Sequence, residues 1–251
     1  IALPAVDWSG VFNVAAMQGH VDLFIIMGYD YYWSGSSQAG PTDPLYTFQN
    51  SYDYNQSRSI THYLNQGVPK EKLLLGLPYY GREWETVGAS APSATTGNFN
   101  TTRFYNYVRQ NANGNYSGSQ YHTASTSNYY VYLSGVNWRQ CFINSDFTLG
   151  KRYDMVNLRG LAGIGIWALG YDDGYSELWN LIEDKFTTCA TVACSDTLYD
   201  LGGPAHNYYD NESFVYTLSP TGATSVDVNF SSFSVESGFD TLWIYDGNSV
   251  N

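Results

Sequence analysis

The sequence predicts a parallel α/β sheet or barrel, followed by the beginning of an antiparallel β-sandwich. Three observations predict this. Continuous apolar runs alternate with helical patterns up to about residue 190. A polar stretch over residues 84–145, rich in Ser, Thr, Asn, Gly and Tyr, interrupts that alternation. After residue 195, short alternating segments lie between turn signals.

Continuous apolar runs are typical of parallel strands that are buried on both faces. The four runs occupy residues 1–6, 21–27, 72–77 and 163–169. Helical patterns follow three of them, over residues 57–66, 147–159 and 175–186. Ser57 is the expected N-cap of the first helix, and Gly67 is expected to stop it.

The remaining segments complete the predicted domain organisation. Residues 84–145 are too long for an ordinary loop between a strand and a helix, and we expect an inserted α+β subdomain there. Residues 1–186 then form the first domain, 187–194 a linker and 195–251 part of an all-β sandwich, with strands at 214–218, 225–230 and 241–245. The first and last residues read as strands already under way, so we expect a fragment cut at both ends.

Composition narrows the function classes. Of the 251 residues, 43% are hydrophobic, which is enough for a sizeable core and excludes wholesale disorder. A net charge of −12 with 11 Lys and Arg argues against nucleic-acid binding. No apolar run is long enough to span a membrane. Aromatic residues reach 17%, which favours flat, ring-shaped ligands such as carbohydrate.

Candidate functional residues come directly after the apolar runs, where a parallel barrel carries its functional face. Each run ends in a segment that holds both an aromatic residue and a charged one. Sugar rings stack on Trp and Tyr, and carboxylates and Arg side chains hydrogen-bond to hydroxyl and amide groups. The segments are Asp7-Trp8, Met27-Gly28-Tyr29-Asp30, Tyr80-Gly81-Arg82-Glu83-Trp84 and Trp167-Ala168-Leu169-Gly170-Tyr171-Asp172-Asp173.

Residues 1–186 resemble the C-terminal half of a glycoside hydrolase family 18 domain, the chitinase family. Three segments carry the resemblance: Met27-x-Tyr29-Asp30, the Leu-Gly-Leu-Pro-Tyr-Tyr-Gly-Arg-x-Trp run over residues 75–84, and Gly163-x-Gly165-Ile166-Trp167-x-Leu169. The resemblance implies a TIM (β/α)8 barrel of which strands 5 to 8 are present, with the α+β insertion between strands 7 and 8. It also implies a substrate-assisted, retaining reaction on β-1,4-linked N-acetylglucosamine polymers such as chitin.

The resemblance implies a role for several residues at the strand ends. Tyr29 and Asp30 would be catalytic, because they would hold the N-acetyl group that attacks the anomeric carbon. Substrate-binding roles fall to Met27, Trp167, Arg82, Trp84 and Tyr80. Met27 is equally consistent with plain core packing. Four further acids, Glu83, Glu85, Asp172 and Asp173, receive no catalytic role, and we expect them to be solvated at the rim.

The family's general acid would lie in an Asp-x-x-Asp-x-Asp-x-Glu motif, which this sequence lacks. We therefore expect the acid upstream of Ile1, and the fragment alone to be nearly inactive and poorly stable. Two alternatives stay open. One is a glycosidase of the same family that acts on peptidoglycan or an N-glycan core, and the other is a glycan-binding protein without catalysis. Neither requires a catalytic cofactor, and the sequence leaves the oligomeric state unknown.

The segment from residue 195 resembles the start of a CUB-type β-sandwich, through Gly202-Gly203-Pro204, Tyr208 and the acidic-apolar pattern over residues 233–247. In this resemblance Glu236 and Asp240 occupy the positions of a possible calcium site. Cys189 and Cys194 either form a short disulfide loop or stay as free thiols in the linker. Together with the composition, the domain pairing indicates a secreted or cell-surface protein, with a bacterial source expected.

Overall fold

The fold consists of two sheets built from one continuous chain. In the computed structural model, residues 1–49, 54–187, 197–210, 212–218 and 223–247 are described. Four strands form the first sheet in the order β1-β2-β3-β9, and all neighbours are parallel. Their bounds are β1 (Ala2–Leu3), β2 (Phe24–Met27), β3 (Leu73–Pro78) and β9 (Gly163–Trp167). Each strand coincides with a predicted apolar run, β3 extending one residue beyond it to Pro78, and the parallel arrangement is confirmed.

Helices on this sheet form where the sequence predicts them, with boundaries that differ by one or two residues. The main ones are α2 (Gln56–Asn65), α4 (Asp146–Leu158) and α5 (Glu177–Phe186), and two short ones are α1 (Val14–Met17) and the 3₁₀ turn η1 (Lys70–Lys72). Asn55, and not Ser57, caps α2: its side chain accepts a hydrogen bond from the backbone of Arg58. Ser145 caps α4 in a capping box with Thr148.

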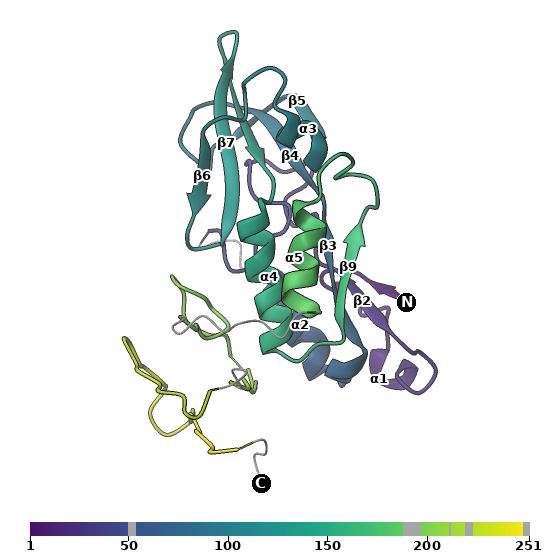
Figure 1. The fold of residues 1–251 in the computed structure, drawn as a ribbon, viewed down its shortest axis with the longest axis vertical. Helices are drawn as coiled ribbons and strands as arrows, with labels where there is room; N and C mark the ends of the chain where they lie inside the picture. The colour runs from purple at the N-terminus through teal and green to yellow at the C-terminus, as the bar shows by residue number, and fades with distance from the viewer. Residues whose placement is uncertain (50–53, 188–196, 211, 219–222, 248–251) are drawn as a thin grey trace.

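A core of aliphatic and tyrosine side chains joins the sheet to the three helices. Leu3, Phe24, Ile26, Leu73, Leu75 and Leu77 come from the strands, and Ile60, Tyr63, Leu149, Tyr153 and Leu178 come from the helices. All of these side chains are buried. In Figure 1, α4 and α5 run side by side over the sheet, and the two helices together cover its apolar face.

The second sheet has five antiparallel strands in the order β5-β4-β8-β7-β6. They are β4 (Tyr80–Thr86), β5 (Thr95–Phe104), β6 (Ser119–His122), β7 (Ser127–Ser134) and β8 (Asn137–Phe142), with α3 (Tyr105–Gln110) after β5. Figure 1 shows this sheet above the parallel one. It lies between β3 and β9 in the chain, as predicted for the insertion, but it starts at Tyr80 and not at residue 84. The reason is that β4 follows β3 with only Tyr79 between them.

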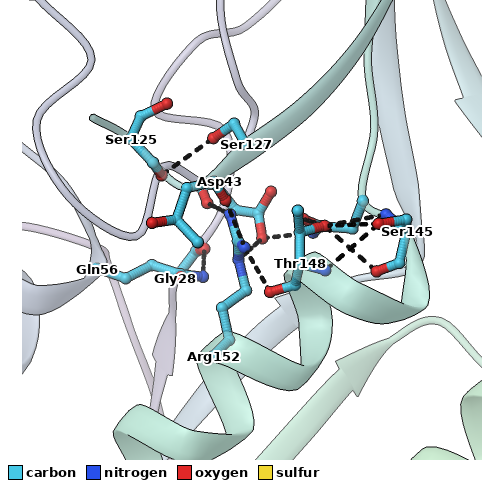
Figure 2. Close-up of polar contacts among 10 residues, drawn as sticks. Gly28, Asp43, Gln56, Ser125, Ser127, Ser145, Thr148 and Arg152 are labelled. Carbon is cyan, nitrogen blue, oxygen red and sulfur yellow. Dashed lines mark hydrogen bonds and ion pairs between the residues drawn. The ribbon is translucent and has the colours of Figure 1, made fainter. Parts of the chain in front are cut away.

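A buried ion pair connects the loop before α2 to α4. Arg152 of α4 is fully buried, and its Nε donates to the Oδ2 of Asp43 over 2.7 Å. Asn144 donates to the same carboxylate oxygen over 2.7 Å, and Arg152 also donates to the backbone oxygen of Thr148 over 2.8 Å. Figure 2 shows the side chain of Arg152 reaching from α4 to Asp43.

The tail after residue 197 corrects one prediction. Within its described residues no strand is assigned, so the strands predicted at 214–218, 225–230 and 241–245 are not formed. A period-two apolar pattern forms a strand only when a neighbouring strand pairs with it, and Val226, Val228 and Phe230 are exposed here. The CUB-like sandwich therefore stays a prediction.

Two further sequence predictions concern the linker and the possibility of a membrane-spanning helix. Cys189, Cys194 and all but the first residue of the predicted linker fall outside the described residues. Among the described helices, none is both long and apolar enough to cross a membrane.

Candidate active site

The carboxyl ends of β2, β3 and β9 lie next to one another, and their register decides which side chains meet. Met27 is paired with Gly76, and Pro78 is paired with Trp167. The backbones at the ends of β2 and β3 are close together: a Cβ atom on Gly28 would lie 2.7 Å from the backbone oxygen of Gly76. The residues that leave the three strands therefore emerge at one edge of the sheet, as predicted.

Asp30 is the centre of a polar cluster at this edge. Its φ angle of +59° is left-handed, a conformation that Asp tolerates better than most residues. Its Oδ1 accepts a hydrogen bond from the Oη of Tyr80 over 2.9 Å. The Nε of Arg82 lies 3.7 Å from the same oxygen. Two residues of β4 thus hold the carboxylate in place while its side chain stays 43% exposed.

Tyr29 lies beside this cluster with its ring against Tyr80. The two ring centres are 6.1 Å apart and the planes meet edge to face at 68°. Burial, reinforced by the negative charge of Asp30, raises the pKa of Tyr29. Burial, then Asp30, also raises the pKa of Tyr80. Both phenols therefore keep their protons at neutral pH, and the hydroxyl of Tyr29 can donate to an acceptor on a ligand.

Trp167 supplies an open aromatic surface at the end of β9. It is 56% exposed, and its backbone oxygen accepts a hydrogen bond from the backbone of Tyr79 over 2.8 Å. Met27 is partly buried beneath the same edge. A shallow depression of about 250 Å³ lies in the turn after Trp167 and is lined by Leu169, Gly170, residues 172–175 and Trp179. An exposed indole at the carboxyl end of a parallel strand is suited to stacking under a sugar ring.

Trp84 is a correction to the predicted site. It is 1% exposed and packs among Tyr31, Tyr32, Phe48 and Phe142 in the core between the two sheets. Residues alternate in direction along β4, so Trp84 and Arg82 share a face, but β8 and the loop before α2 cover the indole. Trp84 is therefore a packing residue in this structure and does not line a groove.

Three of the four acids expected at the solvated rim are buried. Glu83 receives two hydrogen bonds from Arg103, of 2.9 and 3.0 Å, and a third from Tyr116 of 2.6 Å. Glu85 pairs with Arg139 at 3.3 Å, and Asp172 is 3% exposed. Glu83 and Glu85 therefore cross-link strands of the insertion through Arg103 and Arg139. Only Asp173 is exposed as predicted.

Glu236 and Asp240 lie close together in the tail, where a calcium site is predicted. The Oη of Tyr208 donates to Asp240 over 2.6 Å, and the backbone of Glu236 donates to the same carboxylate over 3.3 Å. Across the described chain, no group of three or more His, Cys, Asp and Glu side chains is arranged to hold a metal ion. The calcium site stays a prediction.

Two residues that touch the site were missed in the sequence. The Nε2 of Gln56 donates to the backbone oxygen of Gly28 over 2.8 Å, as Figure 2 shows. The hydroxyl groups of Ser59 and Tyr31 lie 2.6 Å apart. Both α2 residues are fully buried polar side chains. The sequence pattern carries no signal for such contacts.

A parallel sheet whose strand ends carry aromatic and acidic side chains is the architecture of a barrel-type enzyme. The chain belongs to glycosyl hydrolases family 18: the family profile matches residues 1–172.

Individual relatives agree with this assignment. Chitinase C of Streptomyces lividans is 25% identical over 172 residues, which cover 64% of this chain and 26% of that protein. The class V chitinase of Arabidopsis thaliana is 28% identical over 173 residues, covering 66% and 44%. A class V chitinase structure from Nicotiana tobaccum, solved in complex with NAG4, superimposes with a TM-score of 0.64 at 24% identity. That match covers 74% of this chain and 56% of the tobacco one, so the chain spans about half or less of these relatives.

Proposed function

We propose that the protein carrying this chain is a chitinase-like glycosidase that cleaves β-1,4-linked N-acetylglucosamine polymers with retention of configuration. The observation that carries the proposal is the Tyr29-Asp30 pair at the carboxyl end of β2, with Asp30 held by Tyr80 and Arg82. In the proposed alignment β1, β2, β3 and β9 are strands 5 to 8 of the family barrel. The names of the relatives support the substrate class.

The proposed reaction uses the substrate's own N-acetyl group as the nucleophile. Its carbonyl oxygen attacks the anomeric carbon while an acid protonates the departing glycosidic oxygen, and water then opens the cyclic intermediate. Tyr29 donates its hydroxyl to the acetamide and holds it in line. Asp30 accepts from the same sugar, and Trp167 forms an apolar floor below the ring. The family's acid motif is absent from this sequence, so the proposal gives these residues binding and positioning roles only.

The exposed indole of Trp167 also fits a second candidate, a protein that binds N-acetylglucosamine polymers without cleaving them. The same edge residues would then serve recognition alone, because stacking and hydrogen bonding need no acid. Under either candidate, the substrate and the predicted sandwich domain are consistent with a secreted or cell-surface protein.

The test is chito-oligosaccharide cleavage by the full-length protein, with Tyr29→Phe beside a matched Tyr121→Phe control. Tyr121 is exposed on β6 of the insertion, away from the strand ends. Loss of a hydrogen-bond donor that acts on the reacting group lowers kcat about 100-fold or more, and the control is expected to be unchanged. The anomer released first, followed by NMR, should be the retained one.

Each other outcome selects a different conclusion. Binding without cleavage establishes the glycan-binding protein and ends the enzyme proposal. Cleavage of peptidoglycan or an N-glycan core, with chito-oligosaccharides left intact, changes the substrate class. Equal cleavage by Tyr29→Phe and the wild type removes Tyr29 from the mechanism.

A further inference from the structure

The loop that carries Tyr29 and Asp30 is held on both sides by the first turns of α2. Before the pair, Gln56 binds the backbone oxygen of Gly28 over 2.8 Å. After the pair, Ser59 binds the hydroxyl of Tyr31 over 2.6 Å. A displacement of the start of α2 therefore moves both anchors of the loop together.

The start of α2 is in turn held by a residue from the tail, more than 150 positions later in the chain. The Oη of Tyr209 lies 2.6 Å from the Oγ1 of Thr47 and accepts from the Nδ2 of Asn55 over 3.0 Å. Asn55 is fully buried and caps the helix through its Oδ1, which accepts from the backbone of Arg58 over 2.9 Å. Tyr209 thus holds the side-chain amide of Asn55, whose oxygen caps the first turn of α2.

The tail segment around Tyr209 is docked at further points. The backbone oxygen of Leu201 accepts from the Oγ of Ser57 over 3.0 Å, and Leu201 itself is fully buried. Gly203, at a φ of +81°, lies against the ring of Tyr46, where an added Cβ would be 2.4 Å from a ring carbon. These contacts make residues 201–209 a docked strap, and they lie beyond the residues that the family profile matches.

We infer that Tyr209 is a positioning residue for Tyr29 and Asp30, acting through Asn55 and the first turns of α2. The inference rests on the proposed function for its effect on catalysis, and on contacts alone for its effect on the loop. The tail therefore contributes to the site without touching substrate. Displacing the catalytic groups by a distance smaller than an atomic diameter is enough to lower the rate of the reaction.

The experiment compares Tyr209→Phe with Tyr208→Phe in the full-length protein. Among the described residues, the hydroxyl of the neighbouring Tyr208 bonds within the tail, to Asp240 and the backbone of Glu236, so it controls for general loss of a tyrosine hydroxyl there. Hydrogen exchange over residues 24–32 measures the loop directly, and kcat on chito-oligosaccharides measures its consequence. We expect faster exchange in the loop and a kcat about tenfold lower for Tyr209→Phe only.

A double variant separates positioning from general destabilisation. If Tyr209 acts by placing Tyr29 and Asp30, adding Tyr209→Phe to Tyr29→Phe lowers kcat by clearly less than the factor that Tyr209→Phe gives alone, because one of the two groups that it places is already disabled. Full additivity, or unchanged exchange in the loop, overturns the inference. If the wild type cleaves no chito-oligosaccharide, the proposed function fails, while faster loop exchange in Tyr209→Phe still supports the structural link.

Discussion

The buried pair of Asp43 and Arg152 leads to a strong prediction about stability. Replacing Arg152 with Leu leaves a carboxylate inside the core with Asn144 as its remaining side-chain donor. Both partners of the ion pair are essentially inaccessible to solvent, with side-chain exposures of 0% and 5%. Water therefore cannot replace the lost guanidinium (Figure 2).

The magnitude follows from what Arg152 contacts. Its charge faces Asp43 at 2.7 Å, and its Nη1 bonds the backbone oxygens of Thr148 and Thr126 at 2.8 and 3.1 Å. Removing one partner of a buried ion pair costs about 3–5 kcal/mol. A domain of this size loses about 2–4 °C of Tm per kcal/mol, so Tm should fall by about 6–20 °C.

The pH dependence gives a second, independent check. Burial raises the pKa of Asp43 to about 6 from its ordinary 3.8, and the charge of Arg152 opposes that rise. Without Arg152 the pKa rises further, so the folded state binds a proton that the unfolded state releases. Stability of the variant then increases as pH falls, and its deficit relative to wild type should shrink as the pH is lowered toward about 6, where the wild-type carboxyl also takes up its proton.

Urea and thermal unfolding followed by circular dichroism measure both effects. Lys185→Met is the matched control, because it breaks an ion pair with Asp154 whose two side chains are 31% and 36% exposed. Such a surface pair is worth less than about 1 kcal/mol. If Arg152→Leu costs no more than this control, or its deficit does not change with pH, the reasoning about the buried pair is refuted.

Three further predictions concern the site and its surroundings. Tyr80→Phe removes the hydrogen bond to Asp30 and should lower kcat/KM on chito-oligosaccharides about tenfold, whereas unchanged kinetics would exclude a role for that bond. Trp84 is buried, so Trp84→Ala should lower the free energy of unfolding in urea by about 3–5 kcal/mol. Trp167 is exposed, so Trp167→Ala should weaken oligosaccharide binding about tenfold in calorimetry with little change in Tm. The reverse pattern would exchange their roles. Burial lowers the pKa of His122 below its ordinary 6.5, so near this pH the unfolded state binds more protons than the folded state and stability falls as the pH drops. His122→Asn should make the fall of Tm with pH less steep, and an unchanged slope would contradict the prediction.

The parallel sheet could be predicted because its signal is local. Each strand is a continuous apolar run, and the order of runs and helices allows few topologies. The residues that leave the strands could also be predicted to meet, because parallel strands all end at one edge. Tyr29, Asp30, Tyr80 and Arg82 do lie together at this edge and Trp167 ends β9, while their roles toward a ligand stay predictions.

What could not be predicted depends on contacts between distant segments. Trp84 and Glu83 follow a strand end as rim residues would, but contacts from other segments, Phe48 for Trp84 and Arg103 for Glu83, bury them. Ser57 has the composition of an N-cap, but its hydroxyl binds Leu201 from the tail. No pattern within a short window indicates a partner more than a hundred residues away.

The direct passage from β3 into β4 has a consequence for protein engineering. With Tyr79 alone between the two strands, the insertion has no flexible joint at its entry. A chimera with breakpoints at residues 84 and 145 would keep a stub of β4 without β5 or β8 to pair with it. Breakpoints at Tyr79 and after Phe142 would exchange the whole sheet, but they would also remove Tyr80 and Arg82 from Asp30. The insertion is therefore not a separable cassette, and any graft must bring its own partners for that carboxylate.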